Sequence, residues 1–147
     1  MSEVLQPIRE VVSISRGVDA VWRTLTEDQS TPRWLGCMRY RREVGHIFFM
    51  QADQAKAAAG DVSGATQCEI VALEAPRLFK FSWFLPGYPA TYVTFALEPV
   101  DEDATRVTFT HEGWDAFPAD QIKSIHDMLS GGWKSFVLPA LKRAAEA

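Results

Sequence analysis

Three histidines and two cysteines are the residues of this sequence most able to carry acid, base, nucleophilic or metal chemistry: His46, His111, His126, Cys37 and Cys68. No Cys-x-x-Cys or His-Glu-x-x-His spacing brings two of them to one metal ion. A nucleophilic serine or cysteine needs an oriented base, and no Gly-x-Ser-x-Gly turn is present. We therefore predict no metal and no hydrolase site.

His111 is the strongest polar candidate, because the period-two alternation of its strand puts it on the same inward face as Val107 and Phe109. One interpretation is a core histidine whose hydrogen bonds are satisfied. The other is a hydrogen-bonding group at a ligand entrance, where a pKa near 6.5 would also permit proton transfer if the protein is an enzyme. The same alternation makes His46 a second candidate.

Composition excludes several function classes. The net charge of -4 and the pI near 5.3 argue against nucleic-acid binding, and the basic residues Arg39, Arg41 and Arg42 are expected in a solvated loop. No apolar run could span a bilayer, and the N-terminus lacks the pattern of a secretory signal. We expect a cytoplasmic protein with reduced thiols, no membrane insertion, and a single domain over residues 1–147.

The residue pattern of the first half of the chain predicts one strand, two short helices and a second strand. The opening strand is Ile8–Ser15, and Val18, Val21, Trp22 and Leu25 then share one helical face. Pro32 starts a second, short helical turn. Residues 43–51 read as a strand, and 52–65 as a long loop with one helical turn.

Four strand-like runs follow, at residues 66–75, 78–85, 90–99 and 105–113. Their links are too short for parallel crossovers, so the strands are expected to be antiparallel neighbours. Period-two alternation gathers the apolar side chains on one strongly aromatic face. That face carries Phe79, Phe81, Trp83, Val93, Phe95, Leu97, Val107 and Phe109.

A long helix is predicted after Phe117-Pro118, with Asp120 in its first turn. Its apolar stripe is Ile122, Ile125, Leu129, Trp133, Phe136, Val137 and Leu141. Gly131 and Gly132 interrupt this pattern inside the helix, so they do not form a phosphate-binding loop; we expect them to let the helix backbone approach the strands closely. Pro139 is expected to kink or divide the helix.

This layout predicts an α+β protein in which a six-stranded antiparallel sheet curves around the long C-terminal helix. A curved sheet leaves a gap between its concave face and the helix, and that gap is a candidate pocket. The aromatic side chains could instead fill the interior completely, since cores are densely packed. Both outcomes stay open at this point.

The sequence also resembles a known family. The segments VDAVWRTLTEDQSTPRWL, EVGHIFF, CEIVALEAPRLFKFSWFLP, VTFALEPVDEDATRVTFTHEGW and GGWKSFVLPALK are similar to the family named for the activator of heat-shock-protein-90 ATPase. It belongs to the START-like, helix-grip (SRPBCC) superfamily, which includes the birch-pollen allergen. The resemblance covers Ile8 to Arg143 except residues 52–65, where family members usually turn sooner. It implies a helix-grip fold with a hydrophobic cavity, and places the segment His111 to Trp114 at the cavity mouth.

We therefore expect a binding protein that holds a small apolar or aromatic molecule between the sheet and the C-terminal helix, without a cofactor, as a monomer or weak homodimer. One alternative is a cyclase or dehydratase acting on an aromatic or polyketide-like substrate, with His111 as the only catalytic candidate. Another, less favoured, is a protein that assists a chaperone ATPase. The expected ligand contacts are Trp34, His46, Phe48, Met50, Phe81, Trp83, Phe95, Phe109, His111, Trp114, Leu129 and Trp133.

Overall fold

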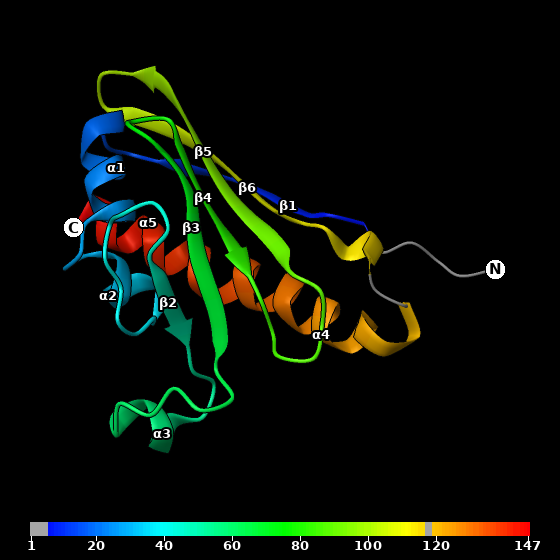
Figure 1. Cartoon of the computed structure of the whole chain (residues 1–147). Helices are drawn as coiled ribbons and strands as arrows, with labels where there is room; N and C mark the ends of the chain where they lie inside the picture. Colours follow the sequence, from blue (N-terminus) through cyan, green and yellow to red (C-terminus); the bar gives the residue numbers. More distant parts are fainter. Residues whose placement is uncertain (1–5, 117–118) are drawn as a thin grey trace.

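Six antiparallel strands form one curved sheet, and a long C-terminal helix lies across its concave face (Figure 1). The structure is a computed structural model that describes residues 6–116 and 119–147. The strand order is β1-β6-β5-β4-β3-β2, so each strand from β2 to β6 pairs with its neighbour in sequence and β1 closes the far edge beside β6. This confirms the predicted α+β helix-grip architecture.

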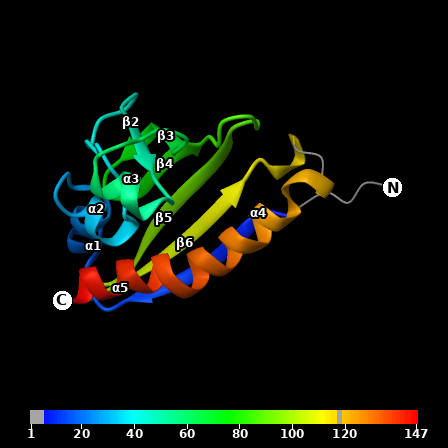
Figure 2. The ribbon, with the colours of Figure 1, turned by 90° about the horizontal axis from the view of Figure 1, so that it is seen from below.

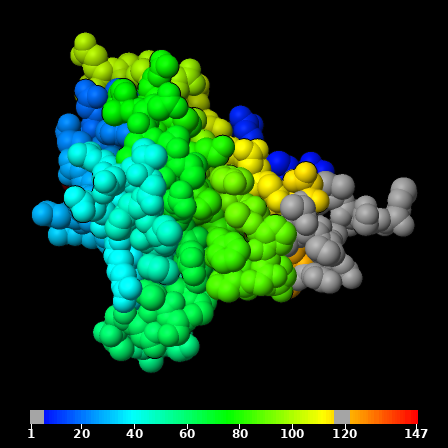
Figure 3. All heavy atoms as spheres, in the orientation of Figure 1, coloured from blue at the N-terminus to red at the C-terminus, as the bar shows by residue number. Residues whose placement is uncertain are grey.

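The elements follow the predicted order. They are β1 (Ile8–Ile14), α1 (Val18–Thr26), α2 (Thr31–Leu35), β2 (Ile47–Met50), α3 (Gln54–Ala58), β3 (Thr66–Glu74), β4 (Leu78–Trp83), β5 (Thr91–Asp101), β6 (Ala104–Glu112), η1 (Trp114–Ala116), α4 (Ala119–Gly132), η2 (Trp133–Val137) and α5 (Leu138–Glu146). The single helical turn expected within residues 52–65 is α3. It protrudes from the body beyond the ends of β2 and β3 (Figures 1 and 3).

The core is built on the aromatic face that period-two alternation predicts. Phe79 of β4 lies opposite Phe95 of β5, which lies opposite Phe109 of β6, so one aromatic row crosses three strands. All three side chains are fully buried beneath the sheet. Seen from below in Figure 2, the C-terminal helix runs along one side of the sheet, next to β1.

Strand β2 is shorter than predicted, because residues 43–46 form a turn instead of extended strand. Gly45 adopts a φ of 90°, a left-handed conformation that keeps β2 from beginning before this residue. Its N–H donates to the carbonyl of Ile70, and the Ile70 N–H donates to the carbonyl of His46. His46 therefore precedes the strand, so its predicted place on an inward strand face is wrong.

The C-terminal helix contains a π-helical turn, η2, which ends two residues before Pro139. The N–H of Leu138 donates to the carbonyl of Trp133, five residues back. The backbone stays right-handed helical at Gly132, Val137 and Leu138, so the helix continues from α4 through this wider turn into α5 and is not broken at Pro139 as a division would require. The predicted start at Phe117-Pro118 lies outside the described residues.

The π-helical turn also changes which residues face the core. One turn of it takes an extra residue, so Leu138 follows Trp133 on the buried face, and Phe136 is turned outward. Phe136 is 73% exposed, so its predicted inward orientation is wrong. The α-helical spacing used for the prediction does not hold across this turn.

The two glycines of the helix do not permit a close approach. A Cβ atom added at Gly131 or Gly132 would meet nothing within 4 Å, which contradicts the predicted role of these residues. A real close approach lies elsewhere: a Cβ at Gly17 would lie 2.6 Å from the carbonyl oxygen of Glu102. Gly17 lets the start of α1 pack against the turn between β5 and β6.

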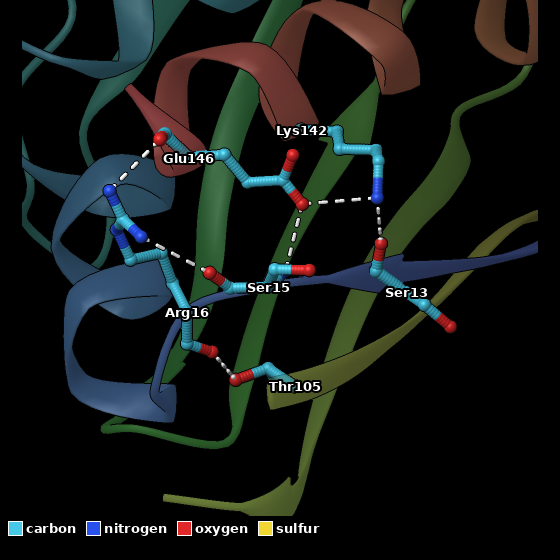
Figure 4. Close-up of polar contacts among 6 residues, drawn as sticks. All are labelled: Ser13, Ser15, Arg16, Thr105, Lys142 and Glu146. Atoms are coloured by element: carbon cyan, nitrogen blue, oxygen red, sulfur yellow. Dashed lines mark hydrogen bonds and ion pairs between the residues drawn. The ribbon is translucent and has the colours of Figure 1, made fainter. Parts of the chain in front are cut away.

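The end of the C-terminal helix is held to β1 by polar contacts (Figure 4). The Glu146 carboxylate accepts from the Ser15 N–H at 2.8 Å and pairs with Lys142 at 3.0 Å. Arg16 donates to the Glu146 carbonyl at 2.9 Å, and Thr105 donates to the Arg16 carbonyl at 2.7 Å. These contacts fix one end of the helix beneath the sheet edge.

Candidate functional site

Most of the predicted ligand contacts lie in a closed aromatic core. Ring centroids are 5.6 Å apart for Trp34 and Phe95, 5.2 Å for Phe48 and Phe81, and 4.6 Å for Phe109 and Trp133. Each of these side chains is buried. Rings at these separations fill the space between them, so this part of the interior is packed with side chains and is not a cavity. We call it the sealed core.

His111 lies inside the sealed core with both ring nitrogens occupied. The Trp133 indole N–H donates to His111 Nδ1 over 3.3 Å, which leaves Nε2 to carry the proton, because an indole nitrogen can only donate. Nε2 then donates to the Thr91 hydroxyl at 2.7 Å, and that hydroxyl donates to the Trp83 carbonyl at 3.1 Å. The chain of hydrogen bonds uses the neutral ring completely.

The electrostatic environment of His111 keeps it neutral. Desolvation by burial, with a smaller repulsion from His126, lowers the pKa of His111 to about 3. The imidazole is fully buried and would have to break a hydrogen bond to exchange a proton. These features are those of a satisfied core histidine, and they do not support the acid or base role that the sequence allowed.

Trp114 is also enclosed, although the family resemblance places it at the cavity mouth. Its indole N–H donates to the His111 carbonyl at 2.9 Å, and its ring lies against the rings of His111 and His126. His46 lies in the turn before β2, where Nε2 is 2.6 Å from the Arg39 carbonyl oxygen. Neither residue borders the apolar groove described next.

An apolar groove opens where α4 passes the ends of β2, β3 and β4. Its volume is about 350 Å³, within the range of small-molecule sites. It is lined by Leu35, Gly36, Met50, Gln51, Ala52, Thr66, Trp83, Leu85, Ile125, Met128 and Leu129. Of the predicted contacts, Met50, Trp83 and Leu129 line it. None of the lining side chains is charged.

Sequence reasoning missed most of the groove residues. Leu85 lies just beyond β4, before the turn at Pro86, and Met128 is 68% exposed beside Leu129. Leu85 ends the predicted strand 78–85 and shares the parity of Trp83, but parity assigns only a face of the sheet and does not tell a packed position from a groove lining. An apolar stripe likewise predicts a buried helix face, not an exposed rim. The available signal was the spacing of Ile125, Met128 and Leu129, which places three apolar side chains along one side of α4.

One rim of the groove is stiffened by the Gln51 side chain. Its Nε2 donates to the carbonyls of Asp61 and Ser63, each at 3.0 Å, and its Oε1 accepts from the Asp53 N–H at 3.2 Å. Gln51 thus ties the start of the 52–65 segment to its end. The amide is fully engaged there, so it contributes to the shape of the rim.

Two other hollows of larger or comparable volume carry charged side chains in their linings. One of about 660 Å³ at the start of α1 is bordered by Gly17, Val18, Asp19, Ala20, Arg23, Pro99, Asp101 and Glu102, and one of about 380 Å³ by Glu27, Asp28, Gln29, Arg41 and Arg42. Small-molecule sites are mostly apolar with a few placed polar groups. The groove beside α4 has no charged lining residue, whereas charged side chains make up half of the lining of the first hollow and four of the five residues of the second.

Metal and thiol chemistry find no support in the described part of the chain. No group of three His, Cys, Asp or Glu residues within it could hold a metal ion. Burial raises the pKa of the Cys37 thiol to about 12 and that of Cys68 well above its ordinary value, so neither is a thiolate at neutral pH. No helix in the described ranges is long and apolar enough to cross a membrane.

Comparisons with solved structures give the same fold. MLL2253 from Mesorhizobium loti is 26% identical, with a TM-score of 0.70 over 92% of this chain and 95% of that one. An Aha1 dimer from Colwellia psychrerythraea is 18% identical, with a TM-score of 0.69 over 97% of each chain. PFC0360w, an HSP90 activator from Plasmodium falciparum, is 14% identical, with a TM-score of 0.73 over 94% of each chain.

Sequence comparison places the chain in a family. No match was found among curated protein sequences. Residues 17–146 match the model of the family described as "Activator of Hsp90 ATPase homolog 1-like protein". The match includes α1, the sheet from β2 to β6 and the C-terminal helix, and with them every residue of the groove. The chain therefore belongs to the Activator of Hsp90 ATPase homolog 1-like family.

Proposed function

We propose that this protein binds a small apolar or aromatic molecule in the groove between α4 and the ends of β2, β3 and β4. The observation that carries the proposal is the lining: apolar side chains from the sheet and the helix border one open volume of about 350 Å³. An apolar molecule that enters such a groove leaves water for apolar surface, and this transfer favours binding.

The lining also favours binding over catalysis. It contains no carboxylate, histidine, lysine or cysteine, so no group there can exchange protons near neutral pH. The cyclase or dehydratase alternative relied on His111, which lies in the sealed core with both ring nitrogens hydrogen-bonded. A groove without an acid or base suits a protein that holds or carries its ligand.

The chaperone alternative has the family description and the printed name of PFC0360w in its favour. Both refer to other proteins, and a shared fold supports the shape of the molecule better than any one activity. An ATPase assay with the cognate chaperone separates the alternatives. Stimulation that is unaffected by a charge in the groove would favour the chaperone role.

The test is titration with N-phenyl-1-naphthylamine, a neutral apolar probe whose fluorescence rises when it leaves water. Met128→Glu places a charge at the rim of the groove, and Phe136→Glu makes the same change at an exposed apolar site of the same helix outside the groove. We expect saturable binding, a raised melting temperature, and a loss of affinity of at least tenfold in Met128→Glu alone.

Equal loss in both variants would mean that the probe adheres to exposed apolar side chains and not to the groove. No saturable binding to the unaltered protein, together with no rise in melting temperature, would contradict the proposal. Because both positions are exposed, neither substitution is expected to disturb folding, which circular dichroism would check.

A further inference from the structure

Two polar groups in the groove lack hydrogen-bond partners. The Trp83 indole N–H and the Thr66 hydroxyl make no hydrogen bond to any residue in the ranges 6–116 and 119–147. Both residues line the groove, and both are more than nine-tenths buried, with exposed fractions of 5% and 8%. Polar groups without a partner in the protein are free to hydrogen-bond with water or with a ligand.

The two groups are open to the groove and not sealed in the core. Within the described residues, the only side-chain nitrogen or oxygen that is both sealed and unpartnered is Nδ1 of His126. The polar atoms of Trp83 and Thr66 therefore retain access to solvent, and the groove that both residues border provides it. By contrast, the indole N–H groups of Trp34 and Trp133 are hydrogen-bonded within the protein.

Strand pairing brings the two groups together. Gln67 and Phe84 pair through two backbone hydrogen bonds of 2.8 Å, so Thr66 lies opposite Leu85, and Trp83 is its diagonal neighbour on the same face. Diagonal neighbours on adjacent antiparallel strands are about 7 to 8 Å apart, which long side chains can bridge. The two residues are therefore neighbours on the side of the sheet that borders the groove.

The chemistry of the pair defines what it would recognise. An indole N–H can only donate a hydrogen bond, whereas a hydroxyl can donate or accept, so the atom that satisfies both is an acceptor. The lining has no lysine, arginine or histidine to pair with an anion, and an unpaired charge in an apolar site is costly. The preferred acceptor is thus neutral.

We propose that the groove selects apolar or aromatic molecules that carry a neutral carbonyl-type oxygen, held between the Trp83 indole N–H and the Thr66 hydroxyl. This inference rests on the proposed binding function and adds ligand class and orientation to it. The apolar body of the ligand would then lie along Ile125, Met128 and Leu129 of α4.

The test compares three related probes on one protein. They are the naphthyl ketone prodan, its parent 2-dimethylaminonaphthalene without the acyl group, and the corresponding 6-dimethylamino-2-naphthoate anion. The unaltered protein should bind prodan about threefold to tenfold more tightly than the parent, because one or two hydrogen bonds are gained. The anion should bind more weakly than prodan.

Substitutions of Thr66 and Trp83 test whether the hydroxyl and the indole N–H cause the preference for prodan over its parent compound. Thr66→Val removes the hydroxyl at nearly constant volume and should reduce the ratio of prodan affinity to parent-compound affinity about threefold to tenfold. Thr66→Ser retains the hydroxyl and should retain the preference. Trp83→Phe should weaken the binding of prodan in the same way. It should also shift the emission of bound prodan toward that of prodan whose carbonyl accepts no hydrogen bond.

The outcomes separate this inference from the proposed function. Saturable binding of all probes with no preference for prodan, or a preference that Thr66→Val leaves intact, would overturn the carbonyl inference while the groove remained a binding site. Tighter binding of the naphthoate anion than of prodan would overturn the inference that the groove prefers a neutral acceptor. If no probe binds the unaltered protein, both proposals fail.

Discussion

The sealed core and the groove lie beneath the same sheet, yet one is filled and the other is open. In the sealed core, side chains from β4, β5 and β6 meet across the strands, and Trp133 closes on Phe109 at 4.6 Å between ring centroids. In the groove, the strands are ending and α4 supplies Ile125 and Leu129, which are smaller than a ring. The sealed core is filled by rings that meet, whereas the groove keeps an open volume of about 350 Å³ between its side chains.

The largest expected difference between the two regions is in stability. Phe95→Ala removes a fully buried ring from the sealed core and should lower the free energy of unfolding by about 3–5 kcal/mol. Leu85→Ala in the half-buried groove lining should cost about 1 kcal/mol or less, because the site is already open. Urea unfolding of both variants measures the contrast, and equal losses would show that the groove is packed as tightly as the core.

The sealed core should also respond to pH. Burial depresses the folded-state pKa of His111 to about 3. Below pH 6.5 the unfolded state therefore binds more protons than the folded state, and the protein becomes less stable as the pH is lowered. Between pH 6.5 and pH 5 the loss is roughly 2 kcal/mol. His111→Phe should remove this contribution to the slope, although it lowers stability at pH 7 by breaking the bonds to Trp133 and Thr91.

The groove offers the control for that experiment. Its lining contains no titratable side chain, so the affinity for N-phenyl-1-naphthylamine should stay constant over the pH range in which the protein remains folded. A His111→Phe protein whose stability still falls as steeply from pH 6.5 to pH 5 would assign the dependence to another group.

Glycines next to the two regions should behave in opposite ways. Gly113 follows β6 at the edge of the sealed core with a φ of 100°, and a Cβ there would lie 3.3 Å from the Thr91 Cα. Gly113→Ala should therefore destabilise by about 1–3 kcal/mol. Gly131→Ala and Gly132→Ala meet open space in a helix and should each stabilise by up to about 1 kcal/mol.

The result that would contradict this contrast is a loss of stability on replacing Gly131 or Gly132, since it would reveal a contact that the geometry lacks. Thermal unfolding of the three single variants is sufficient for the comparison. Probe affinity measured on the same proteins would show whether a stiffer helix closes the groove.

The smallest expected effect lies at the end of the helix, away from both regions. The Ser15 N–H and then Lys142 hold the pKa of the Glu146 carboxyl below its usual range, so this contact stabilises the protein above the ordinary glutamate pKa and is lost as pH falls through the depressed value. Glu146→Gln should lower the melting temperature slightly at pH 7 and not at pH 2. An equal decrease at both values would mean that charge is not involved.

Sequence patterns predicted the regular parts of the molecule well. The order of elements, the antiparallel sheet and its buried aromatic face follow from period-two alternation and short turns, as the row Phe79, Phe95 and Phe109 shows. These local rules hold wherever backbone geometry is regular. They were wrong for His46, which follows a left-handed glycine, and for Phe136, which lies in a π-helical turn.

The groove was harder to predict, because it depends on what the side chains leave empty. Alternation put Trp83 and His111 on the same face, but only the packed structure shows that His111 is enclosed by Thr91 and Trp133 whereas Trp83 borders the groove. Strand parity also puts Leu85 on the face of Trp83, but it does not show that Leu85 and the exposed Met128 border an open volume. Packing therefore has to be known before the site can be identified.

Methyl NMR during titration with N-phenyl-1-naphthylamine tests the central claim most directly. We predict saturable shift changes for methyl groups of the groove, Leu85, Ile125 and Leu129, and none for Val93, Val107 and Leu141 in the buried core. Shift changes centred on those core methyl groups, with the groove unaffected, would show that ligands enter the aromatic interior and would contradict the division into a sealed core and a binding groove.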